Sequence, residues 1–198
     1  EFTAPDAAIL VVDDNIMNLK VIEGLLRPYQ IKVTKATSGR EALDKIETQQ
    51  YDFVFMDHMM PEMDGIETLH RIRKKNGKYY KNVPVIALTA NAIAGMRETF
   101  IKDGFQDFIA KPVEISVLER VLRRNIVPQK LIHLGSGAKM ISMPGVKEEN
   151  REFSVGDLDV QKGLTYCGGM ENYMEILKIH CRDGRNNKEK IERFYQEK

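Results

Sequence analysis

Short apolar runs alternate with amphipathic stretches along the first 124 residues of the chain. Several runs are apolar without alternation, as strands buried on both faces of a sheet require. Between them, apolar residues recur every three or four positions, which predicts helices. Five strand–helix units indicate an α/β fold with a five-stranded parallel sheet, doubly wound and flavodoxin-like. The predicted strands span 8–12, 31–36, 53–56, 83–88 and 108–110.

Capping residues mark several of the predicted helices. Ser38 and Glu41 form a capping box for a helix that ends near Gln49. Asp64 is placed to cap the next helix, and Gly104 to end a later one. The predicted helices span 16–26, 38–49, 65–75, 92–103 and 114–124.

The pattern changes after residue 125. Gly-Ser-Gly at 135–137 and Pro144-Gly145 predict a linker. Helical patterning resumes near Asp159. We therefore expect leader or cloning residues at 1–6, one domain at 7–125, a linker at 126–157 and a partial helical segment at 158–198.

Acidic residues follow two of the predicted strands. Asp13 and Asp14 follow the first strand, and Asp57 follows the third. In a doubly wound sheet, ligands bind at the carboxyl ends of the strands, so these three carboxylates are expected to converge. Like charges that close are unfavourable unless a cation cancels them. Mg²⁺ prefers one or two carboxylates plus phosphate oxygens, so we expect Mg²⁺ (or Mn²⁺) here.

A hydroxyl and an ammonium are predicted at the same edge of the sheet. Thr89 follows the fourth strand and Lys111 the fifth. A carboxylate that attacks phosphorus in line, cations that neutralise the phosphoryl oxygens and a hydroxyl that donates a hydrogen bond together suit phosphoryl transfer. His58, next to Asp57, is interpreted as a residue of the pocket rim.

These strand ends resemble the receiver domains of response regulators and hybrid histidine kinases. The resemblance covers about residues 7–124 and is closer to hybrid-kinase and phosphorelay receivers than to those of transcription factors. It implies the CheY-like form of the doubly wound fold. The matching motifs are ILVVDDN from Ile9, MDHMMPEMDG from Met56, ALTANA from Ala87 and Lys111-Pro112.

By position, the resemblance implies a metal and phosphorylation site. Asp57 would be the phosphoacceptor and, with Asp14, a direct metal ligand. Asp13 would bind the metal through a water molecule, and the backbone carbonyl of Met59 would be a further ligand.

The resemblance also implies a switch. Lys111 would contact the phosphoryl group, and with Asp57 and Thr89 it would form the catalytic set. Thr89 and Phe108 would transmit the signal, although Phe108 lacks the hydroxyl of the tyrosine that many family members have there. Met59 and Asn91 would tune the lifetime of the phosphoryl group.

The implied function is two-component signal transduction. An upstream histidine kinase or histidine phosphotransfer protein would supply the phosphoryl group, and the receiver would catalyse its own phosphorylation and dephosphorylation. A net charge of +1 gives no attraction to nucleic acid, and no apolar run is long enough to span a bilayer. With no signal peptide in the chain, we expect a cytoplasmic location, with a parent protein that could be membrane-anchored.

The segment from Asp159 resembles the opening of a histidine phosphotransfer domain, through Gly163-Leu164 and Gly168-Gly169. None of the chain's four histidines has the sequence context of the active histidine in such domains, so we expect no phosphate relay by this segment. Its apolar faces must pack on the receiver or on a second copy of the chain, or the segment must remain partly disordered; we favour a homodimer. These faces carry Tyr173, Met174, Leu177 and Cys181, then Ile191, Phe194 and Tyr195.

Other kinds of protein share parts of this pattern. A metal-dependent phosphatase with an aspartate nucleophile needs two acids one residue apart, whereas Asp13 and Asp14 are adjacent and point to opposite faces. A flavodoxin-like cofactor module needs free backbone donors in its phosphate loop, where acids would repel a phosphate. A non-phosphorylated interaction module usually lacks one pocket residue, and here none is missing.

Overall fold

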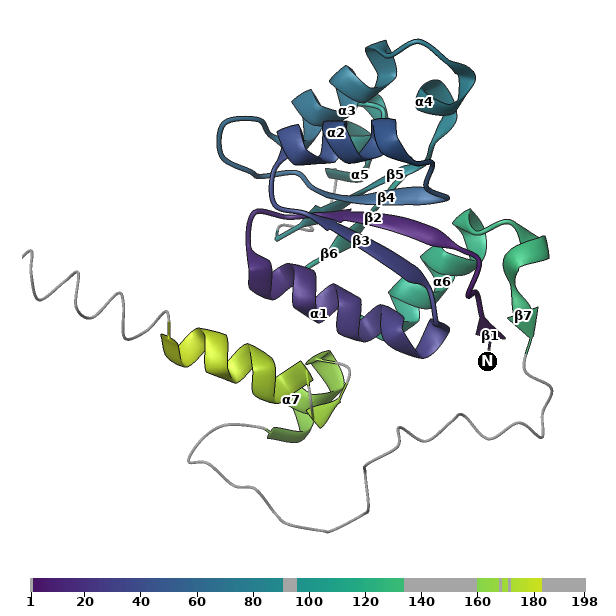
Figure 1. Cartoon of the computed structure of the whole chain (residues 1–198). Coiled ribbons are helices and arrows are strands. Elements are labelled where there is room, and N and C mark those ends of the chain that lie inside the picture. Colours follow the sequence, from purple (N-terminus) through teal and green to yellow (C-terminus); the bar gives the residue numbers. More distant parts are fainter. Residues whose placement is uncertain (1, 91–95, 134–159, 168, 171, 183–198) are drawn as a thin grey trace, which may run out of the picture.

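The computed structural model of the chain describes residues 2–90, 96–133, 160–167, 169–170 and 172–182 (Figure 1). Its centre is a five-stranded parallel sheet with the strand order β3-β2-β4-β5-β6. The predicted fold class is therefore confirmed. The strands are β2 (Ala8–Val12), β3 (Lys32–Ala36), β4 (Phe53–Asp57), β5 (Val85–Thr89) and β6 (Asp107–Ala110).

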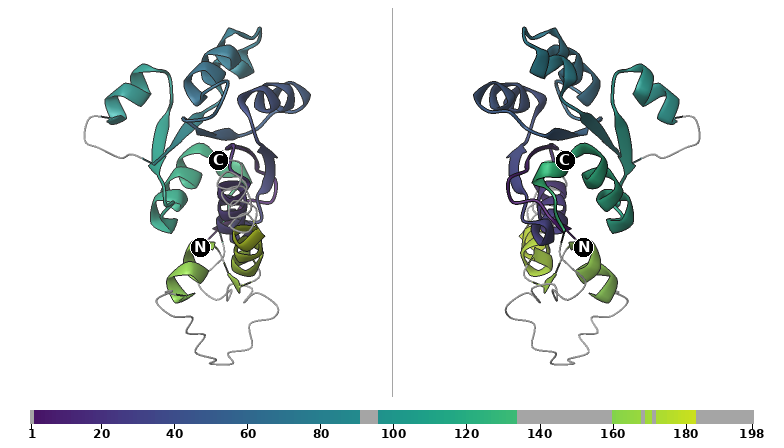
Figure 2. Two further views of the ribbon diagram at one scale, coloured as in Figure 1. Left: turned by 90° about the vertical axis from the view of Figure 1, so that its left-hand side faces the viewer. Right: turned by 90° about the vertical axis from the view of Figure 1, so that its right-hand side faces the viewer.

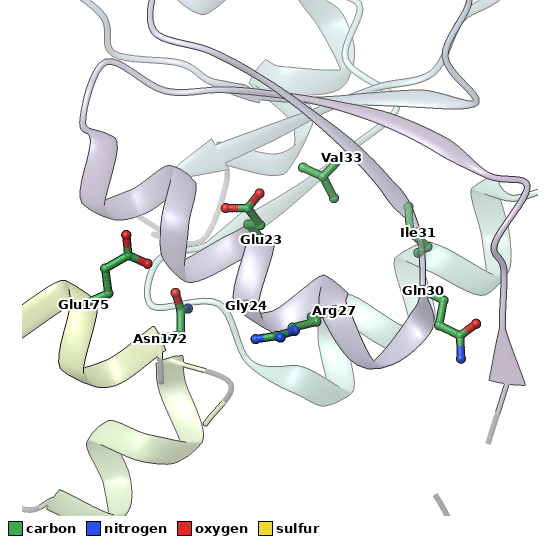
Figure 3. A pocket seen from close by; sticks show the side chains of 8 residues that line it. All are labelled: Glu23, Gly24, Arg27, Gln30, Ile31, Val33, Asn172 and Glu175. Carbon is green, nitrogen blue, oxygen red and sulfur yellow. The ribbon is translucent and has the colours of Figure 1, made fainter. Parts of the chain in front are cut away.

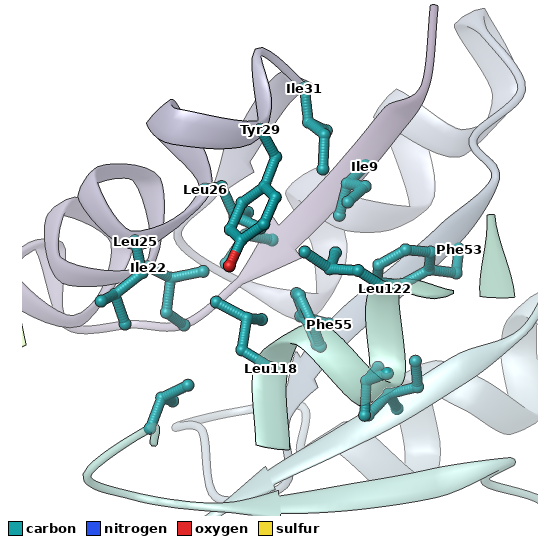
Figure 4. Packing of buried hydrophobic residues seen from close by; sticks show 14 of the residues in the cluster. Ile9, Ile22, Leu25, Leu26, Tyr29, Ile31, Phe53, Phe55, Leu118 and Leu122 are labelled. Carbon is teal, nitrogen blue, oxygen red and sulfur yellow. The ribbon is translucent and has the colours of Figure 1, made fainter. Parts of the chain in front are cut away.

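Helices cover both faces of the sheet, so its central strands are buried on both sides. On one face, apolar residues of α1 (Ile16–Leu26) and α6 (Ile115–Asn125) pack against Phe53 and Phe55 of β4 (Figure 4). On the other face, α2 (Gly39–Thr48), α3 (Gly65–Lys74) and α5 (Met96–Lys102) pack against Val54 and Met56. Alternate residues of β4 thus serve two separate cores.

Where the structure describes them, the predicted helix boundaries agree to within a few residues; the predicted start of the fourth helix, at residue 92, lies outside the described residues. Ser38 caps α2 by accepting a hydrogen bond from the Glu41 backbone nitrogen at 3.2 Å, and Asp64 caps α3 in the same way. Gly104 adopts a φ of 101° just after α5, where a side chain would be strained. The short helix α4 (Lys78–Asn82) and the 3-10 turns η1 (Arg27–Tyr29) and η2 (Pro128–Lys130) were not predicted.

The expected leader and the start of the expected linker are folded instead. Strand β1 (Phe2–Thr3) pairs antiparallel with β7 (Ile132–His133). Phe2 is 3 % exposed, and its ring centroid lies 5.0 Å from that of Tyr29. The Arg123 guanidinium lies over the Phe2 ring, 4.3 Å from the ring centroid. Two-residue strands are too short to give a periodic signal, so the sequence pattern did not reveal them.

Two helical stretches follow at the C-terminal side: α7 (Val160–Cys167) and residues 172–182. We call them the C-terminal helical pair; the second lies alongside α1 (Figures 1 and 2). Tyr173 and Leu177 are half-buried, whereas Met174 and Cys181 are exposed. The predicted face with Ile191, Phe194 and Tyr195 lies outside the described residues, as does most of the expected linker. Within the described ranges, no helix has the length and apolar character that crossing a bilayer requires.

Candidate functional site

Three carboxylates meet where β2 and β4 end side by side. Val12 and Met56 are partners in the parallel ladder, so the residues that follow them lie at the same edge of the sheet. Asp13, Asp14 and Asp57 each offer an oxygen, and these atoms lie within 4.8 Å of one another. Asp13 is fully buried and Asp57 is 7 % exposed, whereas Asp14 faces solvent. The predicted convergence of the three acids is therefore present.

Asp13 is fixed by three donors. Its Oδ1 accepts hydrogen bonds from the Asn15 backbone nitrogen at 2.9 Å and from Asn18 Nδ2 at 3.0 Å. Its Oδ2 accepts one from Lys111 Nζ at 2.6 Å. Asn15 also caps α1 by accepting from the Met17 backbone nitrogen at 2.9 Å, so the start of the helix and the acid form one unit. Asn18 was not predicted as a site residue, although its place on the first turn of the helix after two acids was a signal.

Lys111 joins the two buried acids. Its Nζ lies 2.6 Å from Asp13 Oδ2 and 3.0 Å from Asp57 Oδ2, and its side chain is 20 % exposed. The other Asp57 oxygen, Oδ1, accepts a long contact of 3.4 Å from the Met59 backbone nitrogen. One ammonium cannot balance three carboxylates, so the cluster keeps an excess negative charge at an opening to solvent.

The loop after Asp57 folds back over that residue's own backbone. A Cβ atom on Gly65 would lie 2.3 Å from the Asp57 carbonyl oxygen and 2.8 Å from His58 Cα. Only glycine fits this approach without a shift of the backbone. The Gly65 backbone nitrogen donates to the His58 carbonyl at 3.1 Å, which closes the loop. Gly65 was predicted only as the start of a helix, and this close approach to Asp57 was not predicted.

An aromatic row leads away from the site. Thr89, at the end of β5, is fully buried. Phe108 on β6 is half-buried and stacks on Phe100 with ring centroids 6.0 Å apart. The His58 ring, also half-buried, packs edge-on against Phe100 at 5.3 Å. His58 therefore belongs to this packing. The other predicted tuning residue, Asn91, lies outside the described residues.

The three acids form a set that suits a hard divalent cation. All their donor atoms are carboxylate oxygens, Asp14 is open to solvent, and Mg²⁺ retains water and phosphate oxygens beside one or two carboxylates. A doubly wound sheet with an acid–lysine cluster at the carboxyl ends of its strands defines a small α/β module for phosphoryl chemistry.

The chain belongs to the response regulator receiver domain family, whose model matches residues 9–123. The histidine-protein kinase BarA of Escherichia coli (strain K12) is 37 % identical over 116 residues, which are 59 % of this chain and 12 % of that protein. The sensor histidine kinase GacS of Pseudomonas protegens is 36 % identical over 115 residues, which are 58 % of this chain and 12 % of that protein. The chain thus spans about an eighth of the length of these relatives.

Solved structures agree with this family membership. The receiver domain of a sensor histidine kinase from Pseudomonas aeruginosa is 39 % identical with a TM-score of 0.54, and the match covers 60 % of this chain and 96 % of that one. That structure carries a magnesium ion in its active-site cleft. The chemotaxis protein CheY4 of Vibrio cholerae is 28 % identical with a TM-score of 0.55, and the match covers 61 % of this chain and 98 % of that one. The chain therefore contains a receiver domain of two-component signalling.

Proposed function

We propose that Asp57 accepts a phosphoryl group from a phosphohistidine of a histidine kinase or histidine phosphotransfer protein, in the cytoplasm. The observation that carries this proposal is the Lys111 ammonium between Asp13 and Asp57, at 2.6 and 3.0 Å, within a cluster of three carboxylates. The P–N bond of the phosphohistidine breaks as a P–O bond to Asp57 forms. The imidazole leaves and takes up a proton.

Within this proposal, the two Asp57 oxygens have different tasks. Oδ2 lies 3.0 Å from the Lys111 ammonium, whereas the contact of Oδ1 with the Met59 backbone nitrogen is longer, at 3.4 Å. Oδ1 is therefore the more available nucleophile. The Lys111 ammonium, 3.0 Å from Oδ2, is within reach of a phosphoryl oxygen carried by the same carboxyl group.

A divalent cation held by Asp13, Asp14, Asp57 and the Met59 carbonyl would supply positive charge to the phosphoryl oxygens. Within the cluster, Asp13 is already committed to Asn15, Asn18 and Lys111, which fits an indirect role through water. The residues therefore fit Mg²⁺ or Mn²⁺.

The switch part of the proposal concerns Thr89 and Phe108. New phosphoryl oxygens near the Thr89 hydroxyl would draw it inward, because they are strong acceptors. Phe108 has no hydroxyl to form a hydrogen bond, so a change in its position would be transmitted only through its packing against Phe100. We expect Thr89→Ala to keep most phosphorylation and to lose spectral changes remote from the pocket, as seen by NMR with beryllofluoride. Wild-type changes in that variant would remove Thr89 from the switch.

The acceptor is tested with acetyl phosphate and Mg²⁺, followed by intact-mass measurement. One phosphoryl group should be added to the wild-type chain, and none to Asp57→Asn. EDTA should block labelling, and Asp14→Ala should reduce it strongly. Equal labelling of Asp57→Asn would refute the assignment, and unchanged labelling in EDTA would refute the metal. Steady turnover of p-nitrophenyl phosphate would favour the phosphatase alternative instead.

A further inference from the structure

A built contact joins the C-terminal helical pair to α1 (Figure 3). Asn172 Nδ2 donates to the Lys20 carbonyl at 2.9 Å and to the Cys167 carbonyl at 2.6 Å. The first oxygen belongs to the middle of α1 and the second to the end of α7. One amide side chain therefore links both helices of the pair to the receiver.

Gly24 makes room for this contact. A Cβ atom at residue 24 would lie 2.0 Å from Asn172 Nδ2 and 2.4 Å from the Cys167 carbonyl oxygen. The Asn172 side chain could turn aside, but the Cys167 oxygen is backbone and cannot move without shifting α7. Glycine in a helix interior is unfavourable relative to alanine, so a glycine at this point of α1 weakens the helix while admitting its neighbour.

An ion pair extends this contact toward the start of α1, at the reactive edge of the sheet. Glu175 pairs with Lys20, and this pairing lowers the pKa of the Glu175 carboxyl. Lys20 lies one turn before Gly24, whereas Glu175 lies one turn after Asn172, so the two helices run antiparallel. A cleft of about 460 Å³ lies between them and β3 and is lined by Glu23, Arg27, Val33 and Asn172 (Figure 3).

The far end of this contact lies near the candidate site. Helix α1 begins beside Asp13, since Asn15 both caps the helix and donates to that acid. The end of residues 172–182 lies on the same side of the molecule as the carboxyl ends of the strands (Figures 1 and 2). A large donor that approaches Asp57 past the start of α1 would meet this helix, whereas a small molecule would not.

We propose that residues 160–182 dock on α1 of their own receiver, with Gly24 as the seat for Asn172, and that the docked helices slow phosphoryl transfer from a protein donor to Asp57. The second part rests on the proposed function of Asp57. The occupant is the chain's own segment because it is covalently joined to the receiver, which raises its effective concentration to the order of mM. The contact surface on α1 is polar, so a partner that binds by burying apolar surface would gain little affinity from it.

Gly24→Ala tests the docking, because it has opposite effects with and without the C-terminal helices. In a chain of residues 1–133, alanine should raise the midpoint of thermal unfolding by about 4 °C, since it is the better helix former. The two solved receivers match over 96 % and 98 % of their own chains, so this fold stands without such helices. In the full chain, Gly24→Ala should speed hydrogen exchange in 160–167 at least tenfold, as should Asn172→Ala.

Met174→Ala is the matched control, because Met174 is 47 % exposed on the same helix and should leave exchange unchanged. Protection of residues 160–167 should not depend on chain concentration. Unchanged exchange in Gly24→Ala would overturn the docking, and protection that fails on dilution would assign it to a second copy.

The donor part uses a histidine phosphotransfer protein carrying phosphohistidine, selected because it labels residues 1–133. The full chain should be labelled at least threefold more slowly than residues 1–133, and Gly24→Ala should restore the rate. Acetyl phosphate should label all three equally. If the protein donor labels the full chain and residues 1–133 at equal rates, the docked helices do not slow the transfer and this part of the proposal is refuted. Failure of acetyl phosphate to label any chain at Asp57 would count against the proposed function alone.

Discussion

Replacing Asp14 with asparagine should stabilise the receiver when no metal is present. Two unit charges at the 4.8 Å limit of the cluster repel by about 3.5 kcal/mol at an effective dielectric constant of about 20, and by about 0.9 kcal/mol in water. Asp14 faces solvent, so the lower figure applies to its repulsion with each of Asp13 and Asp57. We therefore expect Asp14→Asn to raise the free energy of unfolding by about 1–2 kcal/mol.

Thermal unfolding in EDTA and across a Mg²⁺ titration measures this effect. In EDTA, Asp14→Asn should raise the unfolding midpoint by about 4 °C or slightly more. Mg²⁺ that binds the folded state should stabilise the wild type as its concentration rises, and the variant much less. Asp44→Asn is the matched control, because it removes one exposed carboxylate on α2. A variant less stable than the wild type in EDTA, or an undiminished response to Mg²⁺, would refute the view of Asp14 as a repelled metal ligand.

Three further changes follow from the structure. Phe2→Ala should lower the free energy of unfolding by about 3 kcal/mol in urea titrations, because it empties a buried site; an effect near zero would mean that the first residues are not part of the core. Gly65→Ala should destabilise the receiver by about 2 kcal/mol and slow labelling by acetyl phosphate, because its Cβ would meet the Asp57 carbonyl at 2.3 Å. The hydrogen bonds from Lys45 and the Thr37 backbone lower the pKa of Glu41 from 4.5 to about 2. The ionised Glu41 contributes about 1 kcal/mol to the free energy of unfolding, a small value because the ion pair is exposed. This contribution is present above about pH 4.5 and lost as the pH falls toward 2. Glu41→Gln should therefore weaken the fall in the free energy of unfolding between pH 4.5 and 2.

The main site residues were predictable because of the geometry of a parallel sheet. All its strands end at one edge, so a residue's place just after an apolar run fixes where its side chain lies. Asp13, Asp57 and Lys111 meet for that reason, although 98 positions separate the first from the last. Their metal and phosphoryl roles remain proposals.

Other contacts could not be predicted from local patterns. The seat of Asn172 against Lys20 joins residues 152 positions apart, and nothing in either helix's periodicity encodes it. Asn172 and Glu175 meet α1, whereas within the predicted apolar stripe Tyr173 and Leu177 are half-buried and Met174 is exposed. Self-association through these helices, and their likeness to a histidine phosphotransfer domain, remain predictions.

The pairing of β1 with β7 sets where the receiver can be tethered. Phe2 lies opposite His133, so the path into the domain and the path out of it leave from one corner. That corner lies at the end of the sheet away from the carboxyl ends of its strands (Figure 1). Segments attached before β1 and after β7 would therefore leave the receiver side by side, at the end of the sheet opposite its reactive edge.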